Sequence, residues 1–237
     1  MGSKKLQRFE AIRSFSNVLQ YPEGMAGKWN VFFKNSNPIT LELGCGRGEY
    51  TVGLSTLYPD KNFIGIDLKG NRIYSGAREC LKNNLHNAAF LRTQIDKLES
   101  YFLPGEVNEI WITFPDPQLR TSRAKKRLTH PKFLRLYQSI LKPDGLIHLK
   151  TDSPALFYFT KFIADLYDLE IQDSSVDIYN RTENPPEIYI RTHYEKLDIA
   201  ESKHVYYLRF SLPEIQIPAP DSKLQELLKQ IEKAELI

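Results

Sequence analysis

Three closely spaced glycines follow a short apolar run in the first quarter of the chain. The run covers residues 39–43, and the glycines are Gly44, Gly46 and Gly48. A strand that breaks on such glycines lets a ligand approach bare backbone at the carboxyl edge of a sheet. The spacing departs from the dinucleotide fingerprint, which would need a glycine at Glu49. Because Glu42 would repel a pyrophosphate, the pattern favours a cofactor with a cationic amino-acid end, and S-adenosylmethionine is such a cofactor.

An acidic residue closes the next apolar run. Asp67 follows residues 62–66 and lies about twenty residues past the glycines. An acid at this place can accept hydrogen bonds from ribose hydroxyls. A helix N-cap is the alternative role, and one Asp can serve both. Strand, glycine turn, helix, strand and acid together favour an adenosine-containing cofactor over an ordinary strand–helix turn.

The composition is typical of a soluble globular protein with one α/β domain. The chain has 237 residues, of which 41% are hydrophobic and 26% charged. No run is long and apolar enough to span a bilayer, and the first residues lack the apolar core of a signal peptide, so we expect a cytoplasmic protein. Two cysteines, Cys45 and Cys80, predict reduced thiols and no metal site.

Positive charge is concentrated in one segment. Between Asp116 and Asp144 there is no acidic residue. The basic residues of this interval are Arg120, Arg123, Lys125, Lys126, Arg127, Lys132, Arg135 and Lys142. The segment follows Phe114-Pro115-Asp116-Pro117 and so leaves the sheet edge where the cofactor is expected. A cationic segment there suits a polyanionic substrate, most commonly nucleic acid, and a solvated loop is the alternative.

Strand-like and helix-like runs alternate along most of the chain. The predicted strands cover residues 39–43, 62–67, 88–92, 109–113 and 145–151. The predicted helices cover residues 49–57, 70–83, 131–141 and 154–168. This alternation predicts an α/β fold with a doubly wound, mostly parallel sheet. Two further strand-like runs, residues 169–174 and 204–212, predict an antiparallel edge strand.

Six motifs together resemble one enzyme family. They are Leu41-Glu42-Leu43-Gly44-Cys45-Gly46-Arg47-Gly48, Phe63-Ile64-Gly65-Ile66-Asp67, Phe114-Pro115-Asp116-Pro117, Lys125-Lys126-Arg127-Leu128, Leu149-Lys150-Thr151-Asp152 and Thr192-His193-Tyr194-Glu195. In this order they resemble the bacterial tRNA (guanine-N7-)-methyltransferases, the TrmB family. The glycine turn is shared by class I methyltransferases, whereas the later motifs are more specific. The resemblance implies a class I (Rossmann-like) S-adenosylmethionine-dependent methyltransferase fold.

The resemblance also implies an activity and a set of site residues. The activity is methyl transfer from S-adenosylmethionine to N7 of guanosine 46 in the variable loop of tRNA, forming 7-methylguanosine. The implied cofactor side chains are Glu42, Asp67 and Asp116, with Gln94 at a fourth position, for which Asp96 is the alternative. Gly44 and Gly46 of the glycine turn complete the predicted cofactor site. The implied substrate positions are Arg120, Asp152, Thr192 and Glu195. Gln118 stands where the family usually has Trp, which weakens any expectation of aromatic stacking there.

The residue types fit this chemistry. Guanine N7 has a free lone pair, so transfer needs no general base and catalysis is mainly positional. The product is cationic, so Asp116 is the candidate catalytic carboxylate, with an Asp-Pro turn as its alternative role. Asp152 and Glu195 could accept from guanine N1–H and the exocyclic amine, with a helix N-cap and a surface charge as their alternatives. Arg123, Lys125, Lys126 and Arg127 would hold tRNA phosphates.

The resemblance divides the chain into three expected parts and leaves two function classes open. The parts are an N-terminal arm at 1–36, a methyltransferase domain at 37–212, and a linker with a C-terminal amphipathic helix at 213–237. A methyltransferase for small molecules or proteins would leave the basic segment without a purpose. A non-catalytic RNA-binding protein would not need the cofactor residues. We expect tRNA as partner, no metal and no membrane, and either a monomer or a homodimer.

Overall fold

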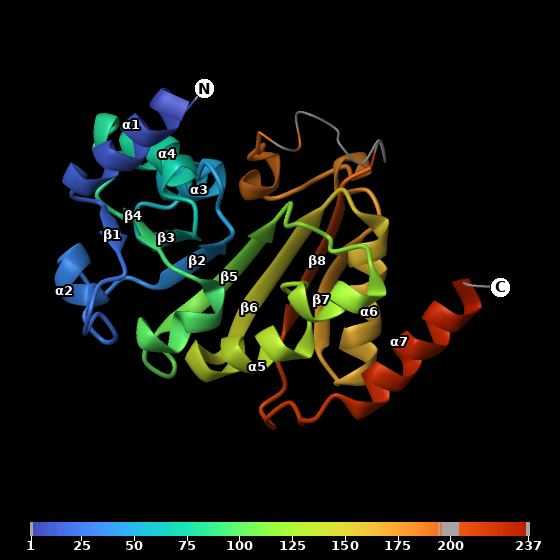
Figure 1. Ribbon diagram of the computed structural model, residues 1–237. Coiled ribbons are helices and arrows are strands. Elements are labelled where there is room, and N and C mark those ends of the chain that lie inside the picture. The colour runs from blue at the N-terminus through green and yellow to red at the C-terminus, as the bar shows by residue number, and fades with distance from the viewer. Residues whose placement is uncertain (1, 194, 196–203, 236–237) are drawn as a thin grey trace.

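One eight-stranded sheet crosses the protein, with helices on both faces (Figure 1). The computed structural model describes residues 2–193, 195 and 204–235. The strands are β1 (Val18–Gln20), β2 (Ile39–Leu43), β3 (Asn62–Asp67), β4 (Ala88–Arg92), β5 (Val107–Thr113), β6 (Leu141–Thr151), β7 (Glu170–Ser175) and β8 (Tyr206–Ser211). Their order across the sheet is β1-β4-β3-β2-β5-β6-β8-β7. Strands β1 to β6 run parallel, and β8 is antiparallel to both of its neighbours.

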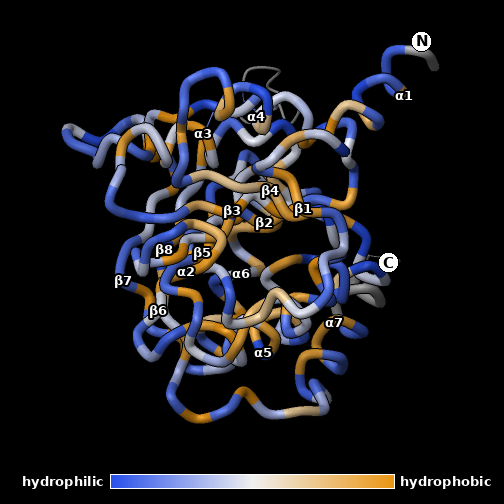
Figure 2. Tube along the Cα trace, turned by 90° about the vertical axis from the view of Figure 1, so that its left-hand side faces the viewer, coloured by the Kyte–Doolittle hydropathy of each residue, from blue (hydrophilic) through white to orange (hydrophobic). Residues whose placement is uncertain are grey.

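Helices cover the two faces of the sheet. The α-helices are α1 (Gly2–Ala11), α2 (Trp29–Phe33), α3 (Glu49–Leu57), α4 (Gly70–Lys82), α5 (Pro131–Ile140), α6 (Pro154–Leu166) and α7 (Ser222–Glu235). Short 3-10 helices are η1 (Ile12–Ser14), η2 (Ile95–Ser100), η3 (Thr121–Lys126), η4 (Ile178–Asn180) and η5 (Pro186–Tyr189). Residues of α3, α4, η4 and η5 pack on one face, and those of α2, α5, α6 and α7 pack on the other. Figure 2 shows the hydrophobic strands at the centre of these layers.

The apolar runs form strands because both of their faces are covered. All five residues of β2 are buried, as expected for a central parallel strand between two helix layers. Leu41 and Leu43 point into the larger core. Glu42 lies between them in sequence and therefore points to the opposite face. A carboxylate within a fully buried strand must find hydrogen bonds there or at the strand end.

The predicted fold class is confirmed, and one strand boundary is corrected. The sheet is doubly wound and mostly parallel, with antiparallel strands at one edge. The predicted bounds of β2, β3 and β4 agree with the structure. Strand β6, however, begins at Leu141 instead of residue 145. Val107 pairs with Leu141 and Glu109 with Leu146, so residues 142–144, which lie between the predicted helix and the predicted strand, form part of an irregular bulge inside one longer strand.

The segment predicted as an N-terminal arm packs onto the sheet. Strand β1 pairs with β4 at the sheet edge, and α1 packs against α4. Trp29 of α2 is fully buried, and its ring stacks on Phe102 with centroids 5.3 Å apart. The division of the chain at residue 36 therefore remains a prediction about domains, although the described residues before it belong to the same packed body.

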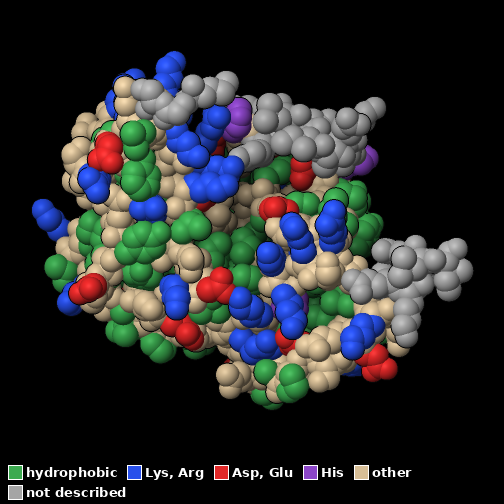
Figure 3. Space-filling model, viewed as in Figure 1, with side chains coloured by type: hydrophobic (Ala, Val, Ile, Leu, Met, Phe, Trp, Pro, Cys, Tyr) green, Lys and Arg blue, Asp and Glu red, His purple; other side chains and the backbone are tan. Residues whose placement is uncertain are grey.

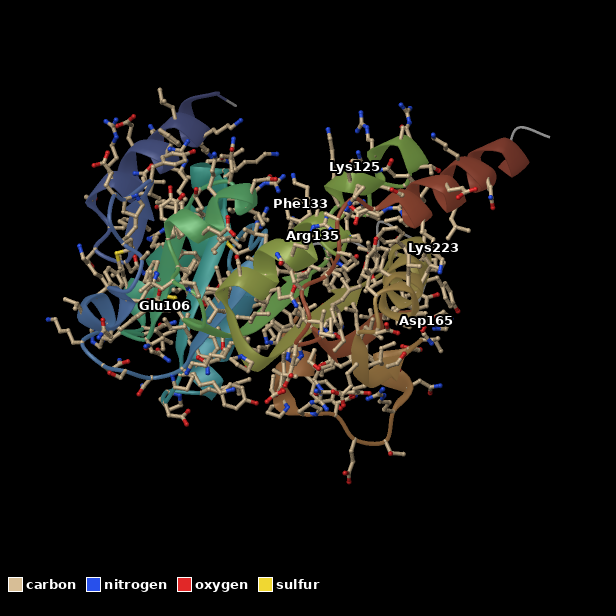
Figure 4. All side chains as sticks on the ribbon, turned by 90° about the horizontal axis from the view of Figure 1, so that it is seen from below. Glu106, Lys125, Phe133, Arg135, Asp165 and Lys223 are labelled. Carbon is tan, nitrogen blue, oxygen red and sulfur yellow. The ribbon has the colours of Figure 1, made fainter. Side chains whose placement is uncertain are left out.

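The segment after β8 is also fixed to the body. Gln138 of α5 donates to the backbone oxygens of Pro213 and Ile215. Arg135, labelled in Figure 4, pairs with Asp221 at 2.8 Å, just before α7 begins. Helix α7 then extends away from the body, with Leu224 fully buried at its base (Figure 1).

Candidate cofactor and substrate site

A cleft of about 790 Å³ opens at the carboxyl edge of the sheet, at the ends of β2, β3, β5 and β6. This is where the strand order reverses between β2 and β5, the position at which doubly wound folds bind ligands. The volume lies within the ordinary range of small-molecule sites, roughly 300–1,000 Å³. Eight of the predicted residues line it, and they are Glu42, Gly44, Gly46, Asp67, Asp116, Lys126, Asp152 and Thr192.

The glycine turn leaves backbone exposed to the cleft. Gly44 has φ +70°, and a Cβ built on it would meet no atom within 4 Å, because that side is open. Gly48, at φ +77°, has the opposite constraint, since its Cβ would come within 2.4 Å of Phe90. One glycine therefore gives a ligand access to the backbone, and the other lets α3 begin close against β4. Cys45 between them is buried, and burial raises the pKa of its thiol, which agrees with a packing role.

Glu42 is a buried carboxylate at the base of the cleft, with only 3% of the residue exposed. Its Oε2 accepts from Thr51 N at 2.8 Å and Thr51 Oγ1 at 2.6 Å. Its Oε1 accepts from Thr113 Oγ1 at 3.1 Å. Burial raises the pKa of Glu42 to about 7, and the hydrogen bonds from Thr51 and Thr113 act in the opposite direction. A nearby cation would therefore favour release of its proton.

Asp67 connects the glycine turn with the start of α4. Its Oδ2 accepts from Gly46 N at 2.9 Å, and its Oδ1 accepts from Lys69 N at 2.7 Å. A carboxylate has about four acceptor positions, so capacity remains for hydroxyl groups of a ligand in the cleft. The N-cap of α4 is Lys69, so the alternative of an N-cap role for Asp67 is wrong.

Asp116 lies in a tight turn after β5. Phe114 and Gln118 on either side have positive φ angles of 46° and 47°. The Oδ1 of Asp116 accepts from Gln118 N at 3.0 Å, so the residue does form a turn. Its side chain is also exposed to the cleft. The two roles coexist, because one oxygen maintains the turn while the carboxylate faces the ligand site.

Two predicted positions lie beside the cleft on β6 and the later loop. Asp152 lines the cleft, and the N-cap of α6 is the next residue, Ser153, whose Oγ accepts from Leu156 N at 3.2 Å. The alternative of an N-cap role for Asp152 is therefore wrong. Thr192 is 5% exposed and lines the cleft, and its Oγ1 accepts from Glu195 N at 3.1 Å.

Neither candidate for the fourth cofactor position is brought into the cleft. Gln94 is exposed at the start of η2, and it is absent from the described cleft lining. Asp96 forms an ion pair with Lys132 of α5 on the molecular surface. Gln94 does follow β4 at the same sheet edge as Asp67, because Asp67 pairs with Arg92.

The basic segment forms a cationic wall beside the cleft. Lys126 lines the cleft itself, while Arg120 and Arg123 line a shallow depression of about 320 Å³ that shares Asp116 with it. Lys125, labelled in Figure 4, lies exposed on η3. Figure 3 shows lysine and arginine side chains gathered over the loop that follows β5.

Arg127 differs from its basic neighbours because it is only 7% exposed. Its guanidinium donates to the backbone oxygens of Gln118 and Leu119 at 3.1 and 3.2 Å. It also lies 4.3 Å from the centre of the Phe159 ring on α6. In this structure Arg127 supports the loop that carries Asp116, and it is not presented to a phosphate.

Glu195 is likewise turned inward. Its side chain is 6% exposed and pairs with Lys150 Nζ at 3.2 Å, while Tyr179 OH donates to its other oxygen. Lys150 was not among the predicted site residues, although a lysine within the apolar run of β6 is an unusual residue for a buried strand. Thr51 and Thr113, which hold Glu42, carry no such signal.

Neither a metal site nor a membrane-spanning helix is found among the described residues. No group of three or more His, Cys, Asp or Glu side chains there is arranged to hold a metal ion. In the same part of the chain, no helix combines the length and apolar content needed to cross a membrane.

Comparisons with known proteins show the family to which the chain is similar. A methyltransferase family model, Methyltransf_4, matches residues 36–208. The chain is 43% identical over 235 residues to the tRNA (guanine-N(7)-)-methyltransferase of Bacteroides thetaiotaomicron, covering 95% of this chain and 92% of that protein. It is 47% identical over 223 residues to the protein of the same name from Christiangramia forsetii, covering 90% and 100%.

Solved structures with low sequence identity share the fold. The 16S rRNA methyltransferase KamB superposes with a TM-score of 0.60 at 14% identity, covering 83% of this chain and 99% of that one. A 16S rRNA (adenine(1408)-N(1))-methyltransferase from Catenulisporales acidiphilia, solved with its cosubstrate SAM, gives a TM-score of 0.52 at 13% identity, covering 81% and 93%. The fold, the cleft and the close relatives lead to one conclusion. The chain belongs to the family of tRNA (guanine-N(7)-)-methyltransferases.

Proposed function

We propose that this protein transfers a methyl group from S-adenosylmethionine to N7 of guanosine 46 in the variable loop of tRNA, forming 7-methylguanosine. One observation carries the proposal. A cleft lined by Glu42, Asp67 and Asp116 lies beside the cationic wall of η3, so a cofactor site adjoins a surface suited to a polyanion. The names of the close relatives support tRNA and guanine N7 as the target.

The residues of the cleft fit S-adenosylmethionine. Glu42 would pair with the amino group of the methionine end, and Asp67 would accept from the ribose hydroxyls. Gly44 and Gly46 would let the cofactor approach the backbone between them. A phosphate chain fits poorly at the glycine turn, because the carboxylates of Glu42 and Asp67 lie there. When bound, the cofactor supplies an electrophilic methyl group.

The residues on the other side of the cleft would hold and orient guanine. Asp152 would accept from guanine N1–H, and Thr192 would contact the base from the loop after η5. Asp116, at the end of β5, would lie near the transferred methyl and stabilise the positive charge that guanine gains. Arg120, Arg123, Lys125 and Lys126 would hold tRNA phosphates without reading sequence. The protein then contributes orientation and electrostatics, and it needs no general base.

Asp67→Ala should weaken cofactor binding by about 1.5–3 kcal/mol, the range for hydrogen bonds to a charged group. Calorimetry on the folded variant measures this directly. Because Asp67 also holds Gly46 N and Lys69 N, Asp67→Asn is the matched control. Asn keeps one acceptor oxygen but loses the charge, so it should bind the cofactor more tightly than the Ala variant. Unchanged affinity in both variants would leave Asp67 with a role only in the turn.

Cofactor affinity should depend on pH through Glu42. With the pKa of Glu42 raised to about 7, the free protein holds a proton there below that pH. A cationic ligand favours the carboxylate, so binding must release the proton, and affinity should fall as pH falls from 7.5 to 5.5. Because one proton is released, the affinity can change by at most about tenfold per pH unit. Glu42→Gln should bind more weakly and lose this dependence, and an unaltered slope in the variant would exclude Glu42 as its origin.

The position of methylation is tested with two tRNA transcripts that differ only at position 46. The transcript with guanosine should be methylated, and the transcript with adenosine should not. Equal methylation of the two would show that the target position is wrong, while the cofactor site would be unaffected by that result.

A further inference from the structure

Lys150 is a fully buried cation directly beneath the cleft, and the proposed function gives it no role. Four acceptors lie within hydrogen-bond distance of its Nζ. They are Tyr179 OH at 2.7 Å, Ile188 O at 2.9 Å, Ile190 O at 3.1 Å and Glu195 Oε2 at 3.2 Å. All four belong to the segment between β7 and β8. A single amino group thus bonds to several points of one irregular segment.

The place of Lys150 on β6 links this segment to the site. Its backbone oxygen accepts from Phe114 N at 2.8 Å, at the start of the turn that carries Asp116. Its Nζ lies 5.3 Å from the centre of the Tyr50 ring and 5.6 Å from that of Phe114. Asp152 of the cleft follows two residues later. Lys150 therefore lies where the ends of β5 and β6 meet α3.

The segment held by Lys150 has few regular hydrogen bonds of its own. Among its described residues, η4 and η5 are short 3-10 helices, and the segment delivers Thr192 to the cleft. Two further contacts tie it to α3. Tyr58 OH donates to Glu187 at 2.5 Å, and Ile190 packs so closely on Gly53 that a Cβ there would come within 2.8 Å.

Glu195 supplies the negative charge that a buried lysine needs. An isolated ammonium group in a protein interior costs several kcal/mol, and removing one partner of a buried pair leaves that cost uncompensated. One carboxylate oxygen of Glu195 bonds to Lys150, and the other accepts from Tyr179 OH. Arg191 also lies 3.9 Å from it. The carboxylate is thus occupied by protein groups and does not line the cleft.

We propose that Lys150 is a positioning residue that, with Glu195 as its counter-ion, holds residues 186–192 on the sheet edge and so places Thr192 against the substrate. In this account Glu195 acts through Lys150. The resemblance places Glu195 among the substrate positions. In this account, however, Glu195 does not accept hydrogen bonds from guanine. The inference rests on the proposed function, because Thr192 matters only if guanine enters the cleft.

A double-mutant cycle tests this inference. The variants are Glu195→Gln, Lys150→Met and the pair together, and the readouts are kcat and KM for tRNA. Glu195→Gln leaves a buried cation without a counter-ion, so we expect KM to rise at least tenfold. In the double variant, neither Lys150 nor Glu195 leaves a charge unpaired. The fold-increase in its KM should therefore be at least tenfold smaller than the product of the fold-increases in the two single variants. Cofactor affinity should stay the same in all variants, because Glu42 and Asp67 are unchanged.

If Glu195 instead contacts guanine, the fold-increases in KM of the two single variants multiply, and the double variant has a higher KM than either of them. That result would overturn the inference. Glu187→Gln is the matched control, because it weakens the Tyr58 contact of the same segment without leaving a buried charge, and its effect should be less than about threefold. An increase in KM for Glu187→Gln as large as that for Glu195→Gln would also contradict the inference.

Hydrogen exchange separates this inference from the proposed function. Amides of residues 187–192 should exchange at least tenfold faster in Glu195→Gln than in the parent protein, and the double variant should recover part of the protection. This readout needs no substrate. It remains informative if no 7-methylguanosine is formed, and unchanged exchange in Glu195→Gln would overturn the inference by itself.

Discussion

Replacing Asp116 with Asn should lower the turnover number by about 10²–10³-fold, the loss typical of removing one preorganised electrostatic group. Guanine becomes cationic as the methyl arrives, so a carboxylate beside it contributes more in the transition state than in the ground state. Asn retains an oxygen that can accept from Gln118 N, so the turn should persist. Single-turnover rates at saturating cofactor and tRNA measure the effect.

Saturating conditions matter because Asp116 is also a proposed cofactor contact. Affinity for tRNA should change little in Asp116→Asn, since phosphate contacts are made by other residues. If the single-turnover rate equals that of the parent enzyme, Asp116 has no catalytic role and serves only binding or the turn.

Neutralising the exposed cations of η3 should give the second large effect. In the variant Arg123→Gln, Lys125→Gln and Lys126→Gln, tRNA affinity should fall and depend less on salt. Each lost phosphate contact lowers the slope of log affinity against log salt by about 0.7–0.9, so three contacts give a change of roughly 2–3 units. Filter binding over a series of salt concentrations measures the slope. Arg127 is left in place, because it is buried and supports the Asp116 loop.

A matched control neutralises three exposed lysines at the opposite edge of the sheet. Lys28 and Lys34 flank α2, and Lys142 is the second residue of β6. Their replacement by Gln removes the same net charge, yet the salt slope should stay within about half a unit of the parent value. Equal slopes in the two triple variants would mean that net charge, and not the cationic wall, governs tRNA binding.

The central part of the fold follows from local sequence patterns. The apolar runs at β2, β3 and β4, separated by turn residues and helical periodicity, define their own bounds. Strand β1 lacks such a signal. It has three residues, all only partly buried, and it forms because β4 offers it a free edge. The bulge in β6 also escaped prediction, because Pro143 and Asp144 resemble the end of a helix and a simple turn.

The cleft residues were predictable because they lie at or just after the carboxyl ends of strands. Parallel strands bring their carboxyl ends to one edge, so Glu42, Asp67 and Asp116 had to meet there. The inward orientations of Arg127 and Glu195 were not predictable. A charged residue in a sequence carries no mark of whether it faces solvent or a distant partner. Arg127 turns inward toward α6, and Glu195 toward Lys150, and both contacts depend on tertiary packing.

Methyl transfer to N7 of guanine within tRNA is the claim on which the account depends most. The direct measurement is incubation of the protein with methyl-labelled S-adenosylmethionine and bulk tRNA, followed by digestion and nucleoside analysis. We predict that the label appears in 7-methylguanosine and that Asp116→Asn strongly reduces its rate of formation. Label in a different methylated nucleoside, or none in tRNA while the protein still binds the cofactor, would contradict the account.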